Sequence, residues 1–281
     1  MSSTVAPMPA PSTAIPAGSP PARAPGRHGR LAWLGSEPAL WTLGLLLVPV
    51  IWHLFSLVND DKLVVGPLDV ARAFGDLTAS GELLTAAQSS GAVLASGLVA
   101  GAIPGLLVGI LLGRFRLLDV VVDPYINAAF ATPLVAIVPI LIVALGFGVE
   151  AKIVIVALFV FFPIAINTAT GVREVPRDLV ELARSFCSTE LKIWRDVLVP
   201  GALPYIVTGF RLAIGRALIA VVVAEFSTSV TGLGFMILRY SRRFRMAEGL
   251  VPVVLLMIVG FVLYWLLKRI EKRLSVWRAA P

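Results

Sequence analysis

Cysteine and histidine, the residues that most often bind zinc or act as nucleophiles, are scarce in this chain of 281 residues. It contains one cysteine, Cys187, and two histidines, His28 and His53, which stand far apart in the sequence. One thiol cannot form an internal disulfide, and three scattered ligands do not make a zinc site. Histidine, cysteine and carboxylate residues also do not cluster at one depth, as a membrane enzyme would require. We therefore expect no catalytic residue and no metal site.

A missing motif predicts that this chain is not a P-loop ATPase. The phosphate-binding loop GxxxxGK[ST] requires a Gly-Lys dipeptide, and the sequence contains none. Any work driven by ATP therefore needs a partner that binds the nucleotide.

Three charged residues, Arg211, Arg216 and Glu225, lie in or beside a long apolar segment. On a helix that rises 1.5 Å per residue, Arg216 lies about 20 Å beyond Leu203. A cation at that depth costs at least a few kcal/mol unless it faces protein or a water-filled cavity. Two interpretations remain open: these residues line a translocation pathway that attracts an anion, or Arg216 pairs structurally with an acidic residue of another helix.

Composition places these residues in a membrane protein. Hydrophobic residues make up 58% of the chain and charged residues 15%, against roughly 45–50% and 25% in soluble domains. We predict an all-α integral membrane protein with about six transmembrane helices. Their predicted ranges are 39–58, 88–112, 132–148, 152–171, 203–226 and 249–267, with an interfacial helix over 117–131.

The pattern of charges predicts the topology. The net charge of +7 is concentrated at the ends of the apolar spans, as expected for cytoplasmic loops, so no nucleic-acid partner is predicted. Both termini are expected in the cytoplasm, although the basic loop 239–245 falls on the predicted outer side. Four regions follow: a disordered Pro/Ala-rich cytoplasmic tail (1–30), the first span with its outer connection (31–81), a transmembrane domain (82–270) and a basic cytoplasmic tail (271–281).

Small residues recur along two of the predicted spans. Glycines occupy every fourth position from Gly97 to Gly113, and a similar stripe of glycine and alanine runs from Gly209 to Ala224. At helical pitch each stripe forms one face on which another helix can approach closely. The stripes are predicted to pack helices, and the wall of a narrow pathway is the alternative.

The longest polar stretch between spans, 172–200, is predicted to form a helical hairpin in the cytoplasm. Asp178 and Glu181 have capping-box spacing, which predicts a helix that begins near Leu179. A second short helix is predicted to end at Pro200 and Pro204. Phe186, Ile193 and Trp194 would be costly in a solvated loop, the alternative structure, so we expect an apolar partner surface to cover them.

This stretch resembles a known motif. Glu181-Leu182-Ala183, then Cys187, then Val197-Leu198-Val199-Pro200 is similar to the EAA motif, E-A-A, x3, G, x9, I-x-L-P, of bacterial ABC-importer permeases. The resemblance covers residues 82–278 and extends to the nitrate, sulfonate and taurine group. The segments that carry the group resemblance are Phe162–Thr168, Ala183-Arg184-Ser185 and Ala224-Glu225.

The resemblance implies a transport subunit that is not itself an enzyme. Such a permease imports a small anion, such as an aliphatic sulfonate, taurine or nitrate, through a multi-pass fold in the bacterial plasma (inner) membrane. The implied partners are a second permease subunit in a homodimer, a cytoplasmic ABC ATPase dimer, an extracytoplasmic solute-binding protein and the lipid bilayer. ATP and Mg²⁺ would bind the ATPase, and this chain would bind no cofactor. A coupling helix between the fourth and fifth spans would dock on the ATPase through Glu181, Ala183, Arg184, Cys187, Val199 and Pro200.

Two residues depart from the motif. Leu182 replaces an alanine, and Cys187 replaces the glycine between the two helices. Glycine adopts positive φ at little cost whereas cysteine does not, so the turn is expected to differ or to suit an adapted ATPase. A redox role for Cys187 is the weaker alternative to simple packing.

A secondary transporter or channel that works alone is the alternative function. It would need relays of ionisable residues within the membrane and, usually, inverted repeats, and we see neither in the sequence.

Overall fold

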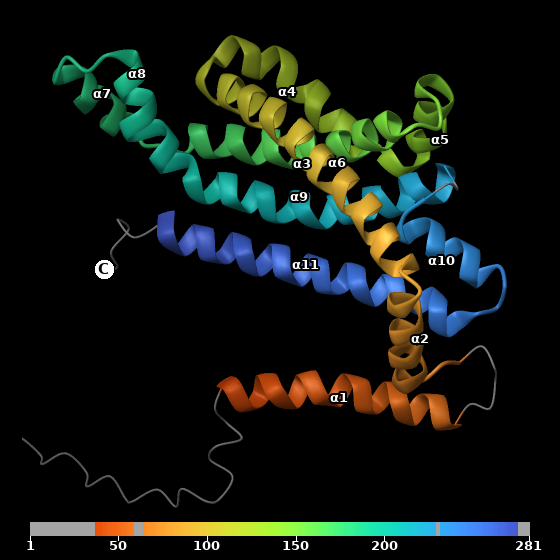
Figure 1. Cartoon of the computed structure of the whole chain (residues 1–281). Helices are drawn as coiled ribbons and strands as arrows, with labels where there is room; N and C mark the ends of the chain where they lie inside the picture. The colour runs from red at the N-terminus through yellow and green to blue at the C-terminus, as the bar shows by residue number, and fades with distance from the viewer. Residues whose placement is uncertain (1–36, 59–63, 229–230, 275–281) are drawn as a thin grey trace, which may run out of the picture. The chain divides into compact units, whose positions relative to one another are not determined.

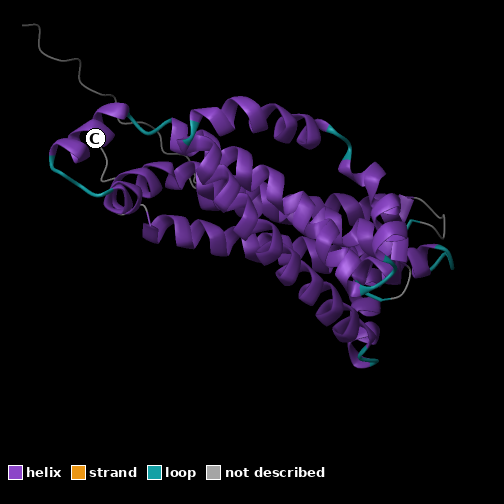
Figure 2. Cartoon of the chain, turned by 90° about the horizontal axis from the view of Figure 1, so that it is seen from above, coloured by secondary structure: helices purple, strands orange, loops and turns teal. Residues whose placement is uncertain are grey.

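The structure is a computed structural model that describes residues 37–58, 64–228 and 231–274. Within these ranges the chain forms helices joined by short loops, with no strand (Figure 2). The predicted all-α class is confirmed. The predicted tail 1–30 lies outside the described residues, as does most of the predicted tail 271–281.

The helices have the following bounds in chain order: α1 Glu37–Val58, α2 Pro67–Ala79, α3 Glu82–Arg114, α4 Arg116–Ala131, α5 Leu134–Leu145, α6 Val149–Arg173, α7 Arg177–Ser185, α8 Glu190–Ile193, the π-helix η2 Trp194–Leu198, α9 Val199–Thr228, α10 Leu233–Ser241 and α11 Met246–Leu274. The chain divides into two compact units after Ile51, and α2 to α11 belong to the second unit.

Four helical segments of the described chain are long and apolar enough to cross a bilayer. They are α3, α6, the continuous helix Glu190–Thr228 and α11. The pair α4 and α5, bent by 94°, makes a fifth span if it counts as one. The first predicted span falls in α1, whose apolar part Leu46–Val58 is shorter. Several membrane spans are therefore confirmed, and a count of six remains a prediction.

The glycine stripe of α3 brings its backbone against α6. A Cβ added at Gly101 would lie 2.4 Å from the carbonyl oxygen of Ala157, and one at Gly109 would lie 2.6 Å from that of Ala165. Gly97 and Gly113 have equally close neighbours on α6. Without water to drive association, helices in lipid are held by this kind of close packing. The prediction of a packing stripe is confirmed.

The stripe of α9 packs on α6, which runs beside α9 in Figure 1 and also makes extensive contact with α3. A Cβ at Gly209 would lie 3.1 Å from the carbonyl oxygen of Pro163. Further along α9 the stripe alanines, such as Ala213 and Ala217, have no exposed surface. α6 is accordingly the most buried of the four long spans. These three helices form the core that positions both ends of the bundle.

The third predicted span is shorter than expected. α5 has 12 residues and would extend about 18 Å at 1.5 Å per residue, less than the roughly 30 Å of hydrocarbon. Thr132 is extended and Pro133 lacks a backbone donor, so the helix breaks between α4 and α5. At the other end Gly146, with φ of 87°, stops α5.

The connecting helices gather at opposite ends of the long ones. α7 and α8 lie at the end where α3 and α6 finish, whereas α2 and α10 lie at the other end (Figure 1). α10 packs against α9, α11 and α3. The two ends of the bundle therefore carry separate candidate sites.

Candidate functional site

The first arm of the hairpin is α7. It begins at Arg177, with Pro176 as N-cap and no side-chain capping bond. The predicted capping box of Asp178 and Glu181 is therefore wrong, because the restricted φ of Pro176 starts the helix about two residues earlier. Asp178 falls within the first turn, where its charge favours the positive end of the helix dipole.

The turn after α7 adopts a left-handed conformation at a cysteine. Cys187 has φ of 53°, and its N–H donates to the carbonyl of Arg184 at 2.8 Å. The N–H of Ser188 donates to the carbonyl of Ala183 at 3.1 Å. These two bonds make a Schellman motif with cysteine in the position that glycine usually fills. The turn expected to differ thus keeps the geometry that glycine would favour, at a steric cost of about 1–2 kcal/mol.

The second arm continues into the membrane without a break. α8, η2 and α9 form one helix of 39 residues from Glu190 to Thr228. The prediction that Pro200 and Pro204 end a separate short helix is wrong. Pro200 has no backbone N–H to donate to the preceding turn. The π-helical turn at Trp194–Leu198, which bonds residues five apart, comes just before it, and the helix continues through the proline. The 39 residues span about 58 Å, so the first turn lies outside a hydrocarbon core of roughly 30 Å.

The hairpin is anchored through the side of the second arm. Ile193 and Leu198 are buried in a cluster with Val172, Val175 and Ala202 at the ends of α6 and α9. Trp194 packs on the same cluster. The prediction that Ile193 faces a partner is therefore wrong, because the chain's own spans bury it, whereas Trp194 is half-buried against the same cluster.

Other apolar side chains of the hairpin are uncovered in this chain. Leu182 is 54% exposed, Phe186 76% and Leu191 78%, and Leu179 is also exposed. Leu179, Leu182 and Phe186 share one side of α7, by their spacing of three and four residues. We call these four residues the hairpin face. Of the three side chains predicted to need a partner, only Phe186 belongs to it.

A carboxylate joins the two arms to the end of α3. Arg114 donates to one oxygen of Glu190 at 3.1 Å, and Arg184 donates to the other at 3.1 Å. These hydrogen bonds, that from Arg114 first, lower the pKa of Glu190 below its ordinary value. All three groups are partly or largely exposed. We call this arrangement the Glu190 clamp.

The residues predicted to couple to an ATPase occupy different positions on this frame. Glu181 and Cys187 are exposed, whereas Ala183 packs on the buried cluster. Arg184 belongs to the clamp. Val199 and Pro200 begin α9, away from the turn. A docking role for these six residues remains a prediction.

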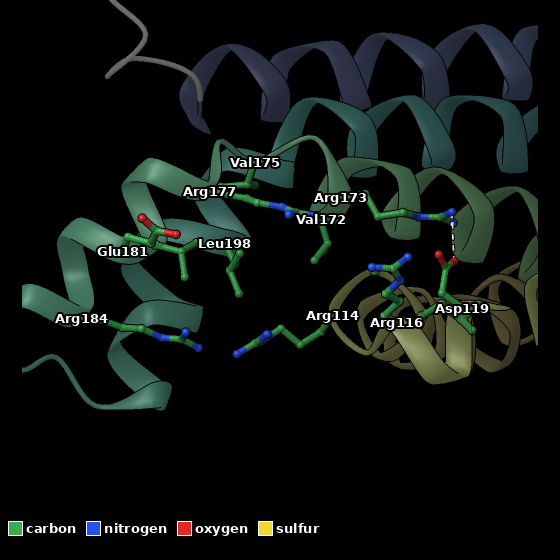
Figure 3. A pocket seen from close by; sticks show the side chains of 13 residues that line it. Arg114, Arg116, Asp119, Val172, Arg173, Val175, Arg177, Glu181, Arg184 and Leu198 are labelled. Atoms are coloured by element: carbon green, nitrogen blue, oxygen red, sulfur yellow. Dashed lines mark ion pairs between the residues drawn. The ribbon is translucent and has the colours of Figure 1, made fainter. Parts of the chain in front are cut away.

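A cavity of about 580 Å³ lies between the hairpin and the ends of α3 and α6. Five arginines and two carboxylates line it, together with apolar groups such as Val175 and Leu198. Figure 3 shows Arg114 and Arg184 reaching toward one another from opposite walls. Arg173 on α6 is held by Asp119 and Asp123 of α4, each at 3.0 Å.

The predicted pathway residues are not brought together. Arg211 forms an ion pair of 2.9 Å with Glu271 of α11. Arg216 is half-buried and its guanidinium lies 4.2 Å from the centre of the Phe130 ring. Among the described residues no carboxylate pairs with Arg216, so the cation–π contact is its visible stabilisation.

Glu225, the third predicted pathway residue, is fully buried near the opposite end of α9. One carboxylate oxygen accepts a 2.6 Å bond from the hydroxyl of Ser90, and the other accepts a 2.7 Å bond from the N–H of Gly234. Ser90 in turn accepts from the N–H of Leu233. We call this cluster the Glu225 knot, and it fastens α10 to α3 and α9.

Sequence reasoning missed several members of these sites. In the sequence, Ser90 is an ordinary polar residue and Lys152 an ordinary charge at the start of a span. Both are buried at the knot, and Lys152 donates to the carbonyl of Thr231 at 3.3 Å. Arg114 was assigned only to topology. Gly232 carried a usable signal, since a glycine in a short loop suggests close approach: a Cβ there would lie 2.1 Å from the Glu225 carboxylate.

The chain resembles known transport proteins over most of its length. Residues 105–276 match the family model of the binding-protein-dependent transport system inner membrane component. The aliphatic sulfonates transport permease protein SsuC of Bacillus subtilis is 33% identical over 85% of this chain and 88% of the relative. The bicarbonate transport system permease protein CmpB of Synechococcus elongatus is 36% identical over 60% of this chain and 62% of the relative.

The fold is also similar to that of a solved transporter. A structure of the methionine ABC transporter MetNI in an inward-facing conformation superposes with a TM-score of 0.55 at 25% identity, over 66% of this chain and 93% of that chain. The family match covers more than half of the chain and agrees with this fold and with the sulfonate permeases. The chain therefore belongs to the family of binding-protein-dependent transport system inner membrane components, the permeases of ABC transporters.

Proposed function

We propose that this chain is the membrane-spanning permease of an ATP-driven importer and moves a small anion into the cytoplasm. The hairpin face carries the proposal: four large apolar side chains stand exposed on a helix frame that is anchored to two spans. An exposed apolar patch next to the membrane marks a protein contact. Since the chain has no phosphate-binding loop, the fitting occupant is a separate ATPase that binds ATP and Mg²⁺.

The hairpin end is proposed to face the cytoplasm of a bacterial inner membrane. Arginines cluster at this end, where α3 and α6 finish at Arg114 and Arg173 and the cavity adds three more. Positive charge favours the cytoplasmic side. Both termini would then be cytoplasmic, and α2 and α10 would face an extracytoplasmic solute-binding protein. A second copy of the chain would complete a homodimer.

The anionic solute is supported by relatives and by one side chain. Sulfonates and bicarbonate, named for two relatives, are both anions. Arg216 stands inside the predicted fifth span without a carboxylate partner among the described residues, whereas Arg211 is neutralised by Glu271. An uncompensated cation in a span is a candidate for contact with an anion.

Reconstitution tests the proposal. Proteoliposomes with the permease, its copurifying ATPase and its binding protein should accumulate a radiolabelled sulfonate, nitrate or bicarbonate when ATP is supplied. Omission of the ATPase should abolish accumulation. Uptake by the permease alone would instead identify a secondary transporter or channel and overturn the proposal.

The chain carries its own probe of orientation. Cys187, its single cysteine, is exposed on the hairpin. A membrane-impermeant maleimide should label it in inside-out vesicles and not in intact spheroplasts. Cys187→Ser combined with Ser241→Cys moves the thiol to an exposed site at the opposite end and should reverse the pattern. Labelling of Cys187 in intact spheroplasts would contradict coupling through this hairpin.

A further inference from the structure

The cavity behind the hairpin has more positive charge than its carboxylates can neutralise. Arg114 and Arg184 share Glu190, and Arg173 is held by the two aspartates of α4. Arg116 and Arg177, which also line the cavity, have no side-chain hydrogen bond or ion pair within the described ranges. The N–H donors of these two guanidinium groups are therefore free to bind a ligand in the cavity.

Docking of an ATPase on the hairpin face would not use these donors. At 100° per residue, Arg177, Glu181 and Arg184 fall on one side of α7. Leu179, Leu182 and Phe186 fall on the opposite side. A partner that covers the leucines would leave the arginine side facing α3 and α4, as in Figure 3.

The position of the cavity selects the chemistry of its ligand. Arg114 is the last residue of α3 and Arg173 the last of α6, so the cavity lies where two spans meet the aqueous layer. Phosphodiester groups of lipids occupy this level, and soluble phosphates reach it from the water. Guanidinium groups bind phosphate oxygens through paired, charge-assisted hydrogen bonds.

We propose that this cavity binds a phosphoryl group, held by Arg116 and Arg177 on opposite walls. A volume of about 580 Å³ accommodates a lipid headgroup or a small phosphorylated solute. The bound anion would bridge α4 and α7 beside the Glu190 clamp, and so tie the hairpin to the spans. Binding requires neither the ATPase nor transport, so its failure would leave the proposed importer function untouched.

Two arms of one binding experiment distinguish the sources. In the first, the purified chain is placed in phosphatidylcholine nanodiscs with or without phosphatidylglycerol, and retained lipid is counted by native mass spectrometry. In the second, inorganic phosphate is titrated by calorimetry into the chain in pure phosphatidylcholine nanodiscs. Retention in the first arm identifies a lipid headgroup, and heat in the second identifies a soluble phosphate.

The matched variants decide the outcome. R116Q/R177Q should weaken the observed binding at least about tenfold, because two charge-assisted contacts are lost. R242Q/R243Q removes the same charge from exposed arginines at the other end of the bundle and should change binding less than about twofold. R116K/R177K keeps the charge without the paired geometry and should fall between them.

Several results would overturn the proposal. One is equal loss in R116Q/R177Q and R242Q/R243Q, which would mean that net charge alone attracts the anion. Another is the absence of any retained lipid or phosphate heat with the unaltered chain. A third is normal binding by R116Q/R177Q with loss of ATPase assembly, which would assign both arginines to protein docking. Circular dichroism confirms that each variant keeps its helix content.

Discussion

Two carboxylates on one continuous helix show how differently the two ends of the bundle are held. Glu190 and Glu225 each accept two hydrogen bonds from other elements, at distances between 2.6 and 3.1 Å. The partners of Glu190 are Arg114 at the end of α3 and Arg184 of the exposed hairpin. The partners of Glu225 are a hydroxyl and a backbone N–H in a site with no exposed surface at Glu225.

The difference in surroundings changes what each carboxylate can do. Exposed ion pairs contribute little to stability and weaken with salt, so the Glu190 clamp can open and close at small cost. A buried hydrogen-bonded carboxylate is costly to disrupt because its buried donors are left without an acceptor. The hairpin end is thus built to move and the knot end to hold, and the following experiments test that division.

The largest effect is expected from Glu181→Lys. Glu181 lines the cavity with Arg177 and Arg184, on the side of α7 opposite the hairpin face. A lysine there adds a like charge beside two arginines and should displace the hairpin that carries the proposed docking surface, since like-charge contacts cost several kcal/mol. ATP-driven uptake in proteoliposomes should fall at least about tenfold, while membrane insertion stays normal. Glu174→Lys, an equal charge change at an exposed residue before α7, serves as the control and should keep most activity. Normal uptake by Glu181→Lys would show that coupling does not depend on how the cavity side of α7 holds the hairpin.

Glu225→Leu should act on stability. It leaves the Ser90 hydroxyl and the Gly234 N–H without their acceptor in a buried site, at about 1–3 kcal/mol each. We expect the free energy of unfolding, measured by titration with sodium dodecyl sulfate in mixed micelles, to fall by about 2–4 kcal/mol. Glu150→Leu, at an exposed residue, should shift it by less than about 0.5 kcal/mol. A similar change in the free energy of unfolding for both variants would show that the Glu225 knot does not stabilise this end of the bundle.

Arg216→Ala separates transport from anchoring within the span. If the guanidinium attracts the anion, uptake should fall several-fold with assembly unchanged, and Arg216→Lys should restore part of it. Arg211→Ala is the control, since Arg211 is already neutralised by Glu271. Unchanged uptake with lowered stability in Arg216→Ala would assign the residue to its contact with Phe130.

Cys187→Gly should tighten the hairpin. Glycine adopts the observed φ of 53° without steric strain, so the turn should gain about 1 kcal/mol. Amide hydrogen exchange at residues 187 and 188 should slow about fivefold. Ser185→Gly, two residues earlier and within α7, should instead loosen the helix by about 1 kcal/mol. Faster exchange in Cys187→Gly would show that the cysteine side chain itself stabilises the turn.

The smallest effect concerns the Glu190 clamp. The fold lowers the pKa of the Glu190 carboxyl below its ordinary value of 4.5. The stability that the clamp adds to the fold is therefore fully present above pH 4.5 and is lost as the pH falls through the lowered pKa. At neutral pH the clamp is fully charged. Raising NaCl to about 1 M should screen the attraction between Glu190 and its two arginines and so slightly speed amide exchange in α7. Exchange in α10, beside the buried knot, should stay constant. An equal response in both helices would erase the contrast between the two ends.

Much of the fold was predictable because each membrane span is encoded by a long, continuous apolar segment of the sequence. The four long spans follow from apolar length, and the packing of α3 on α6 follows from Gly97 to Gly113 at every fourth position. These signals depend on one segment at a time. The break at Pro133 and the unbroken passage through Pro200 depend on how neighbouring helices and a π-turn accommodate a missing donor. The same residue type therefore gave opposite outcomes.

The sites were less predictable because their members come from distant segments. The hairpin and the candidate residues Glu181 and Arg184 were found by a local motif, yet their partners at Arg114 and Glu190 depend on tertiary contact. The Glu225 knot joins Ser90 to a residue 135 positions away, and a serine in a sequence does not indicate such a bond. The cysteine at the left-handed turn shows that a departure from a motif need not change the backbone.

The unbroken helix from Glu190 to Thr228 has a mechanical consequence. Glu190 and Glu225 are 35 residues apart on it, or about 52 Å along the axis. With the far end fixed, a tilt of about 5° would move the turn near Glu190 sideways by about 4–5 Å, close to one helical pitch. The helix is continuous through η2, where the N–H of Val199 donates to the carbonyl of Trp194, so the hairpin arm and the span move as parts of one helix. The same helix would transmit movement in the reverse direction, so a displacement at the Glu225 end would also move the hairpin at the opposite surface.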